Sequence, residues 1–96
     1  MLKKRYLERI KSEAVRFAKK NTGVKIFIFG SSLSQKNFGD VDLGILGKVN
    51  YRAVAELKEN FADSTIPYFI DIVNFNKVSK EFKENVFSNK VLWIKR

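Results

Sequence analysis

Residues 24–42 read VKIFIFGSSLSQKNFGDVD, an apolar run followed by a glycine-serine turn, a polar loop and two aspartates. The run from Val24 to Phe29 is short, β-branched and aromatic, which predicts a strand, and its apolar character predicts a central place in a sheet. From residue 40 to 46 polar and apolar side chains alternate, which predicts a second strand. Two strands joined by a polar loop are therefore the expected centre of the fold.

The segments around these strands have helical or strand-like spacing. Residues 2–20 carry apolar side chains on one helical face, Asn50 can cap a second helix, and Ser79 can cap a third. Further strands are predicted at residues 68–75 and, at the edge of the sheet, at 91–94. The apolar residues expected inside these helices are Leu7, Ile10, Ala14, Phe17, Ala18, Val54, Leu57, Phe61, Phe82, Val86 and Phe87. The order α-β-(α)-β-α-β-α-(β) predicts an α/β (α+β) domain with helices packed on a small sheet.

The composition fits one compact domain over residues 1–96 and narrows the available chemistry. The chain is 45% hydrophobic and contains no Cys and no His. This excludes disulfide scaffolds, thiol nucleophiles, the usual zinc sites and every Ser-His or Cys-His mechanism. No apolar run approaches the ~18–20 residues of a membrane span, so we expect a cytoplasmic protein without a membrane partner. The net charge of +9 predicts an anionic partner, but charge alone does not choose among nucleic acid, nucleotide phosphates and acidic proteins.

Three of the four aspartates lie within predicted strands, where aspartate is depleted. Asp40 and Asp42 share one face of a strand, and Asp71 interrupts an apolar strand. Like charges this close are unfavourable unless a cation lies between them, and an unpaired charge on a buried strand is unfavourable too. A hard divalent ion bound by all three carboxylates would resolve both problems, and Mg²⁺ fits the oxygen-only donors best. Ion pairs with some of the 19 Lys and Arg residues are the alternative.

The turn after the first predicted strand is a candidate anion site. Gly30 has no Cβ, so a phosphate can approach the backbone there. Ser31 offers a hydroxyl, and the amides of Ser31 and Ser32 would open a short helix that points at an anion. A plain turn is the alternative reading of Gly-Ser-Ser. The P-loop, the dinucleotide fingerprint and the EF-hand loop are all absent from the chain.

In combination, these features resemble the polymerase-β nucleotidyltransferase superfamily, and more narrowly its minimal nucleotidyltransferases. The shared pattern is Gly30-Ser31, a loop of eight residues, Asp40-Val41-Asp42 on the next strand and Asp71 on the third. It extends over nearly the whole chain, from Val24 through the final helix. The resemblance implies a small mixed sheet of that type and a single minimal nucleotidyltransferase domain.

The resemblance also implies a reaction, in which AMP passes from ATP to an acceptor hydroxyl. Two Mg²⁺ ions would hold the triphosphate, and Asp71 would face the acceptor. The residues assigned to metal and catalysis are Asp40, Asp42 and Asp71; those assigned to the nucleotide are Gly30, Ser31 and Ser32. Minimal nucleotidyltransferases are commonly paired with a helical HEPN protein, often an RNase toxin that they modify with AMP as antitoxins. The basic first helix and the tail around Trp93 are the surfaces expected to meet such a partner, and a core or edge-covering place for Trp93 is the equal alternative.

The chain departs from the family pattern in the loop at residues 32–39. Many relatives carry an Arg shortly after the Gly-Ser pair and a Ser before the first Asp. Here Lys36 is the candidate replacement for the positive charge, and Gly39 stands where the Ser would be. This departure and the net charge of +9 support an alternative, a non-catalytic module that binds nucleotide, RNA or protein on a degenerate transferase fold. Nucleic acid is the less favoured partner, because acidic groups repel phosphates in the absence of metal.

Overall fold

All residues from 1 to 96 are described by a computed structural model, in the order α1-β1-η1-β2-α2-β3-α3-β4. The helices are α1 (Lys4–Lys20), α2 (Tyr51–Ala62) and α3 (Lys80–Phe87), with one 3₁₀ turn, η1 (Ser31–Leu33); the strands are β1 (Lys25–Phe29), β2 (Asp40–Leu46), β3 (Phe69–Asn74) and β4 (Leu92–Lys95). Every predicted element is present, including the short turn after β1 and the strand β4. None of the helices combines the length and the apolar character that crossing a bilayer requires.

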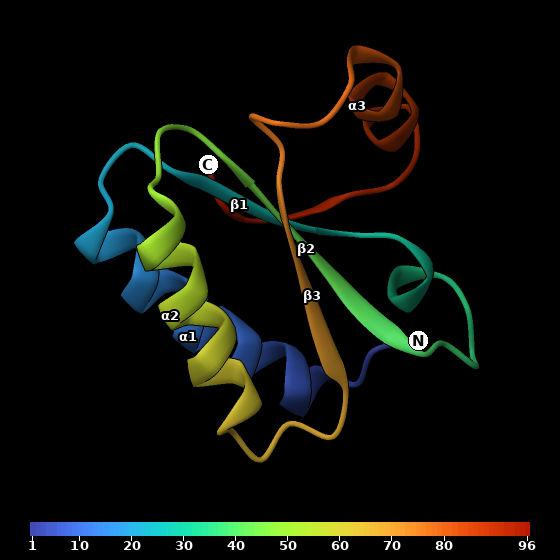
Figure 1. The fold of residues 1–96 in the computed structure, drawn as a ribbon. Coiled ribbons are helices and arrows are strands. Elements are labelled where there is room, and N and C mark those ends of the chain that lie inside the picture. Colours follow the sequence, from blue (N-terminus) through green and yellow to red (C-terminus); the bar gives the residue numbers. More distant parts are fainter.

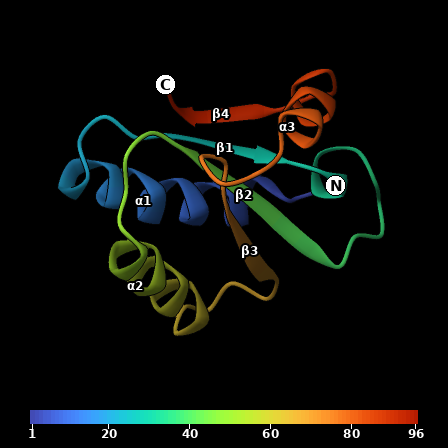
Figure 2. The same cartoon turned by 45° about the horizontal axis from the view of Figure 1, so that its top comes forward.

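The four strands form one mixed sheet in the order β3-β2-β1-β4 (Figures 1 and 2). Strand β1 is antiparallel to both of its neighbours, β2 and β4, whereas β2 and β3 are parallel. The parallel pair needs a crossover connection, which α2 provides. The predicted central place of β1 and the predicted α/β fold with a mixed sheet are both confirmed, and β3 and β4 form the two edges.

Helices α1 and α2 cover one face of the sheet, and α3 lies on the other side (Figure 2). The main core lies under α1 and α2, because alternate strand residues turn towards them. Its fully buried members include Ile10, Ala14, Ile26, Ile28, Val41, Leu43, Ile45 and Leu57. The same alternation sends the intervening residues of β2 and β3 to the opposite face, where the aspartates of the two strands are found.

An aromatic cluster fills part of this opposite face, beneath α3. Phe27 is completely buried, and its ring centroid lies 4.8 Å from that of Phe75 and 5.1 Å from that of Trp93. Gly44 is the cross-strand partner of Phe27, and a Cβ at Gly44 would overlap the Phe27 ring. The prediction that Phe82 lies inside is wrong, since this residue is 41% exposed. Helix α3 has only eight residues and covers one end of the sheet face, so Phe82 lies at the border of the cluster.

A two-way hydrogen bond joins the loops that follow β2 and β3. The side-chain amide of Asn76 donates to the backbone carbonyl of Gly47 at 2.6 Å, and the backbone amide of Gly47 donates to the side-chain oxygen of Asn76 at 3.2 Å. We expect Asn76→Ala to reduce the free energy of unfolding by about 1 kcal/mol, since both backbone groups lose a fixed partner. Thermal unfolding should show a decrease of roughly 4–8 °C. An unchanged unfolding temperature would mean that water replaces this link at no loss.

Candidate functional site

The three strand aspartates lie together on the sheet face opposite α1 and α2. Val41 and Leu43 point into the main core, so Asp40 and Asp42, which alternate with them, point away from it. Asp71 is the direct partner of Asp42 across the parallel pair of β2 and β3. The carboxylates of two neighbouring strands therefore share one patch of the sheet.

Asp42 is half-buried, whereas Asp40 and Asp71 are exposed. The expectation that Asp71 lies on a buried strand is wrong, because β3 is an edge strand and only its helix-facing side chains, Ile70 and Ile72, are buried. The physical problem posed by the site is consequently the mutual repulsion of three carboxylates, and burial matters for Asp42 alone.

None of the three carboxylates has a hydrogen-bond or ion-pair partner. The ion pairs of the molecule all lie along helices, between Glu8 and Lys11, between Glu13 and Arg16, and between Lys80 and Glu84. The alternative in which nearby Lys and Arg residues neutralise the aspartates is therefore not what the structure shows. Burial, and then the negative charges of Asp71 and Asp40, raise the pKa of Asp42 above its ordinary value of 3.8.

The raised pKa of Asp42 predicts how stability depends on pH. The folded state binds the proton of the Asp42 carboxyl more tightly than the unfolded state does. The contribution of this group to the free energy of unfolding therefore falls as pH rises from about 3.8 through the raised pKa, and it stays lower at neutral pH. We expect Asp42→Asn to raise the unfolding temperature of the metal-free protein at pH 7 by roughly 1–3 °C, a small gain because solvent screens the charge of a group that is only half-buried. The difference from the unsubstituted protein should vanish below about pH 3.8. A variant that is less stable at pH 7 would contradict the repulsion.

Gly30 lies against the Asp42 side chain at the end of β1. Phe29 is the cross-strand partner of Asp42, so the next residue turns over this carboxylate. The φ of Gly30 is +87°, in the left-handed region, and a Cβ there would overlap an Asp42 carboxylate oxygen. Only glycine meets both requirements, so the predicted open approach to the backbone lies directly beside the aspartates.

The two serines after Gly30 have different environments. Ser31 is half-buried, and its carbonyl accepts hydrogen bonds from the amides of Ser34 and Gln35. Ser32 is fully buried, and its hydroxyl has no hydrogen-bond partner. Because Ser31 and Ser32 open the 3₁₀ turn η1, their amides have no partner within it. Ser31 can therefore offer both a hydroxyl and an amide to a ligand, whereas Ser32 has no exposed surface through which to contact one.

The donors at this patch fit Mg²⁺. Three unpaired carboxylates are hard oxygen ligands, and a glycine beside one of them leaves room for a phosphate. The side chains do not form a preformed cluster of three metal-ligating groups. Asp40 and Asp71 are exposed strand residues that can change rotamer on binding, and a divalent charge would remove the repulsion at Asp42.

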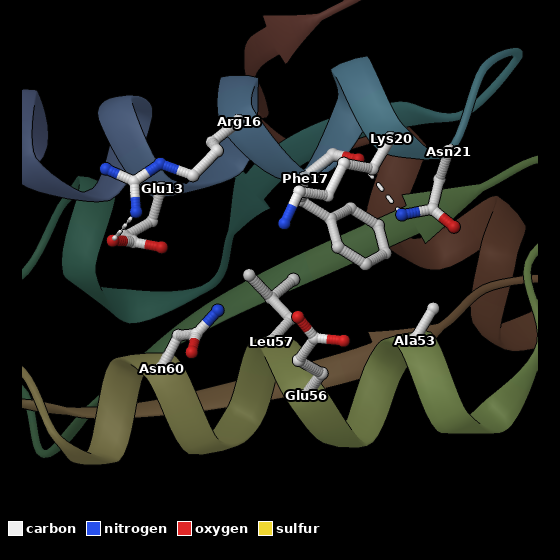
Figure 3. Close-up of a pocket in the computed structure, with 9 residues that line it drawn as sticks. All are labelled: Glu13, Arg16, Phe17, Lys20, Asn21, Ala53, Glu56, Leu57 and Asn60. Carbon is white, nitrogen blue, oxygen red and sulfur yellow. Dashed lines mark hydrogen bonds and ion pairs between the residues drawn. The ribbon is translucent and has the colours of Figure 1, made fainter.

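A second polar hollow, between α1 and α2, does not compete as a nucleotide site. Figure 3 shows the polar side chains of both helices around it, with Arg16 paired to Glu13 at 3.4 Å. Its volume is about 30 Å³, enough for one water molecule. It lies on the helix side of the sheet, away from the aspartates.

Sequence reasoning missed one residue of this face, Phe69. It is the cross-strand partner of Asp40 and lies two residues before Asp71, so the three side chains share the open face. Phe69 is 67% exposed, which is unusual for a phenylalanine in a strand. The period of two that placed Asp40 beside Asp42 would also have placed Phe69 beside Asp71.

The chain is similar to known proteins in sequence. Residues 12–96 match the family described as Polymerase beta, Nucleotidyltransferase. The chain is 30% identical over 63 residues to the probable protein adenylyltransferase MntA of Haemophilus influenzae, which covers 62% of this chain and 55% of that protein. The chain therefore spans about half the length of this curated relative.

Solved structures share the fold. A crystal structure of a variant of the toxin–antitoxin MntA–HpeT has a TM-score of 0.65 at 17% identity, over 88% of this chain and 70% of that one. A toxin–antitoxin crystal structure with AMP-PNP has a TM-score of 0.62 at 19% identity, over 88% and 71%. The complex of a tri-AMPylated Shewanella oneidensis HEPN toxin with an MNT antitoxin has a TM-score of 0.59 at 18% identity, over 88% and 67%. With the family match over most of its length, the chain belongs to the polymerase-beta nucleotidyltransferase family.

Proposed function

We propose that this protein is an Mg²⁺-dependent nucleotidyltransferase that transfers AMP from ATP to a hydroxyl group of a protein. The observation that carries the proposal is the set of three unpaired carboxylates on adjacent strands, beside a glycine that can have no side chain. A module that only bound phosphate or RNA would gain nothing from repulsive charges at that place. The similarity to a probable protein adenylyltransferase supports AMP as the group and protein as the acceptor.

The positions of the site residues assign some of them to ATP and others to the acceptor. Gly30 and Ser31 lie at the β1 side of Asp42, and their amides and hydroxyl would bind the outer phosphates of ATP. Asp71 lies on the opposite side, on the edge strand β3, where an acceptor can approach. Asp40, Asp42 and Asp71 would hold Mg²⁺. When bound, the metal supplies positive charge that stabilises the attacking and leaving oxygens.

The transfer is balanced without a further co-reactant. The acceptor oxygen forms a bond to the α-phosphorus while the bond from that phosphorus to the bridging oxygen of the β-phosphate breaks. Pyrophosphate leaves with the bond electrons, and the Asp71 carboxylate accepts the hydroxyl proton and returns it to water. No histidine or cysteine is needed, which agrees with the composition.

We propose further that the protein acceptor is a HEPN-type helical toxin, so that the chain acts as its antitoxin. Support comes from similar structures in which MNT or MntA proteins are complexed with toxins, one of them an AMPylated HEPN toxin.

The direct test compares ATP labelled on the α-phosphate with ATP labelled on the γ-phosphate. Each is incubated with Mg²⁺ and the purified protein in a lysate of the native host. We expect label from the α-position alone on one discrete polypeptide, and loss of that label when EDTA removes the metal. Label from the γ-position would indicate a kinase instead. No transfer from either position, together with no binding of Mg²⁺-ATP, would favour the non-catalytic binding module.

A further inference from the structure

The free edge of β3 borders a groove that leads to the candidate site. Strand β3 is the end strand of the sheet, and α2 runs beside it, joined to it by residues 63–68 (Figure 1). No hydrogen bond outside the sheet ladder involves the backbone of residues 67–73. The outward backbone groups of this strand are therefore available to another chain.

Two hollows follow this edge from one end of β3 to the other. The first has a volume of about 650 Å³ and is lined by Pro67, Tyr68, Phe69 and Asp71, among others. The second, of about 420 Å³, lies beside Val73 and Asn74. Lys58 and Ile72 line both, so the hollows adjoin. Six residues of strand extend for roughly 20 Å, a length that suits an extended chain better than a compact small molecule.

The charges of the groove favour a polypeptide over a nucleic acid. Its lysines, Lys58 and Lys77, are matched by its acidic residues, Glu59 and Asp71, and most of the remaining lining is apolar. A nucleic acid needs an excess of basic side chains against its phosphates. The excess of Lys and Arg in this chain lies elsewhere, notably along α1.

We propose that this groove binds an extended segment of the acceptor protein, which adds as a further strand to the edge of β3. The inference rests on the proposed function and adds to it where and in which conformation the acceptor binds. Backbone hydrogen bonds to β3 provide affinity, and apolar side chains of the peptide pack between β3 and α2. The acceptor hydroxyl reaches Asp71 past the exposed ring of Phe69, from the side opposite Gly30. Its oxygen forms the new bond to the α-phosphorus, pyrophosphate leaves, and the Asp71 carboxylate accepts the proton.

Groove-filling variants of α2 test the proposal. Ala62 and Ala55 are exposed alanines that line the first and the second hollow, so a tryptophan at either position occupies the groove without entering the core. The matched control is Ser12→Trp, a small exposed residue of α1. The assay uses ATP labelled on the α-phosphate, Mg²⁺ and native-host lysate, and the affinity for Mg²⁺-ATP is measured in parallel. We expect Ala62→Trp and Ala55→Trp to reduce protease-sensitive labelling at least tenfold with Mg²⁺-ATP affinity unchanged within twofold, and Ser12→Trp to change neither.

The outcomes test acceptor binding in the groove separately from the proposed function. Equal labelling by the groove variants and the unsubstituted protein would show that the acceptor does not bind in the groove, and it would leave the proposed transferase activity supported. Labelling sensitive to RNase, not protease, would overturn the peptide acceptor. If the unsubstituted protein neither labels a macromolecule nor binds Mg²⁺-ATP, the proposed function is wrong. Whether the groove binds an extended peptide is then tested by a binding measurement alone.

That measurement is an NMR titration of the ¹⁵N-labelled protein with the capped peptide TVYVT, which alternates as a strand requires. We expect amide shifts confined to residues 66–74 and the facing side of α2, slowed amide exchange in β3, and loss of both effects in Ala62→Trp. No shift in β3 at millimolar peptide, or equal shifts in Ala62→Trp, would overturn the groove whatever the labelling shows.

Discussion

Asp42→Asn is expected to reduce AMP transfer by about 10³-fold or more while leaving the fold intact, a loss typical of removing a group that stabilises transition-state charge. Asp42 is the central member of the three carboxylates, beside Gly30, which directly follows β1, and opposite Asp71 on β3. An asparagine has nearly the same shape but cannot supply the negative charge that holds Mg²⁺. Transfer should be measured with ATP labelled on the α-phosphate, and folding by circular dichroism and thermal unfolding of the same sample.

The matched control is Asp63→Asn. Asp63 is the one aspartate outside the site, exposed at the end of α2 and free of ion pairs. Its substitution removes the same charge from the same protein, so the overall field changes equally in both variants. We expect Asp63→Asn to retain at least half of the activity. Equal losses in the two variants would show that net charge matters and that the carboxylate patch does not, which would contradict the proposed site.

Much of the fold could be predicted because its elements have distinct spacing. The strand β1 lies between Gly23 and Gly30, and the helices α2 and α3 begin after Asn50 and Ser79. The side chain of each of these two cap residues accepts a hydrogen bond from the backbone amide three residues further along the chain. The strand order was not predicted in detail, because a pattern of apolar residues does not say which strand becomes an edge. That uncertainty caused the wrong expectation about the burial of Asp71.

The candidate site was predictable as a set of residues but not as an arrangement. A period of two places Asp40 beside Asp42, whereas the facing of Asp42 and Asp71 depends on the register of a parallel pair, which chain order does not determine. The orientation of Ser32 is a second feature that the sequence does not determine. Its place after Gly30 indicated a ligand contact, yet the side chain turns inward because η1 packs against the sheet.

Phe27→Ala is expected to produce the largest loss of stability, about 3–5 kcal/mol, since it removes a fully buried ring from the centre of the aromatic cluster. The Phe27 ring lies 4.8–5.8 Å, centroid to centroid, from the rings of Phe75, Phe87, Trp93 and Phe29. Gly44 offers no side chain to fill the space that the ring vacates. Chemical denaturation should give the free energy of unfolding, and the unfolding temperature should fall by at least ~12 °C.

Two comparisons make this result specific to the cluster. Phe27→Leu keeps most of the apolar volume and should lose only about 1–1.5 kcal/mol. Phe69→Ala removes the same ring from the same sheet face, but Phe69 is 67% exposed, so the loss of stability should stay within about 0.5 kcal/mol. If Phe27→Ala and Phe69→Ala unfold at the same temperature, the aromatic cluster does not hold α3 and β4 to the sheet. If they differ as expected, the buried rings beneath α3 stabilise this face of the sheet, whereas the exposed Phe69 at the edge of β3 contributes little to stability.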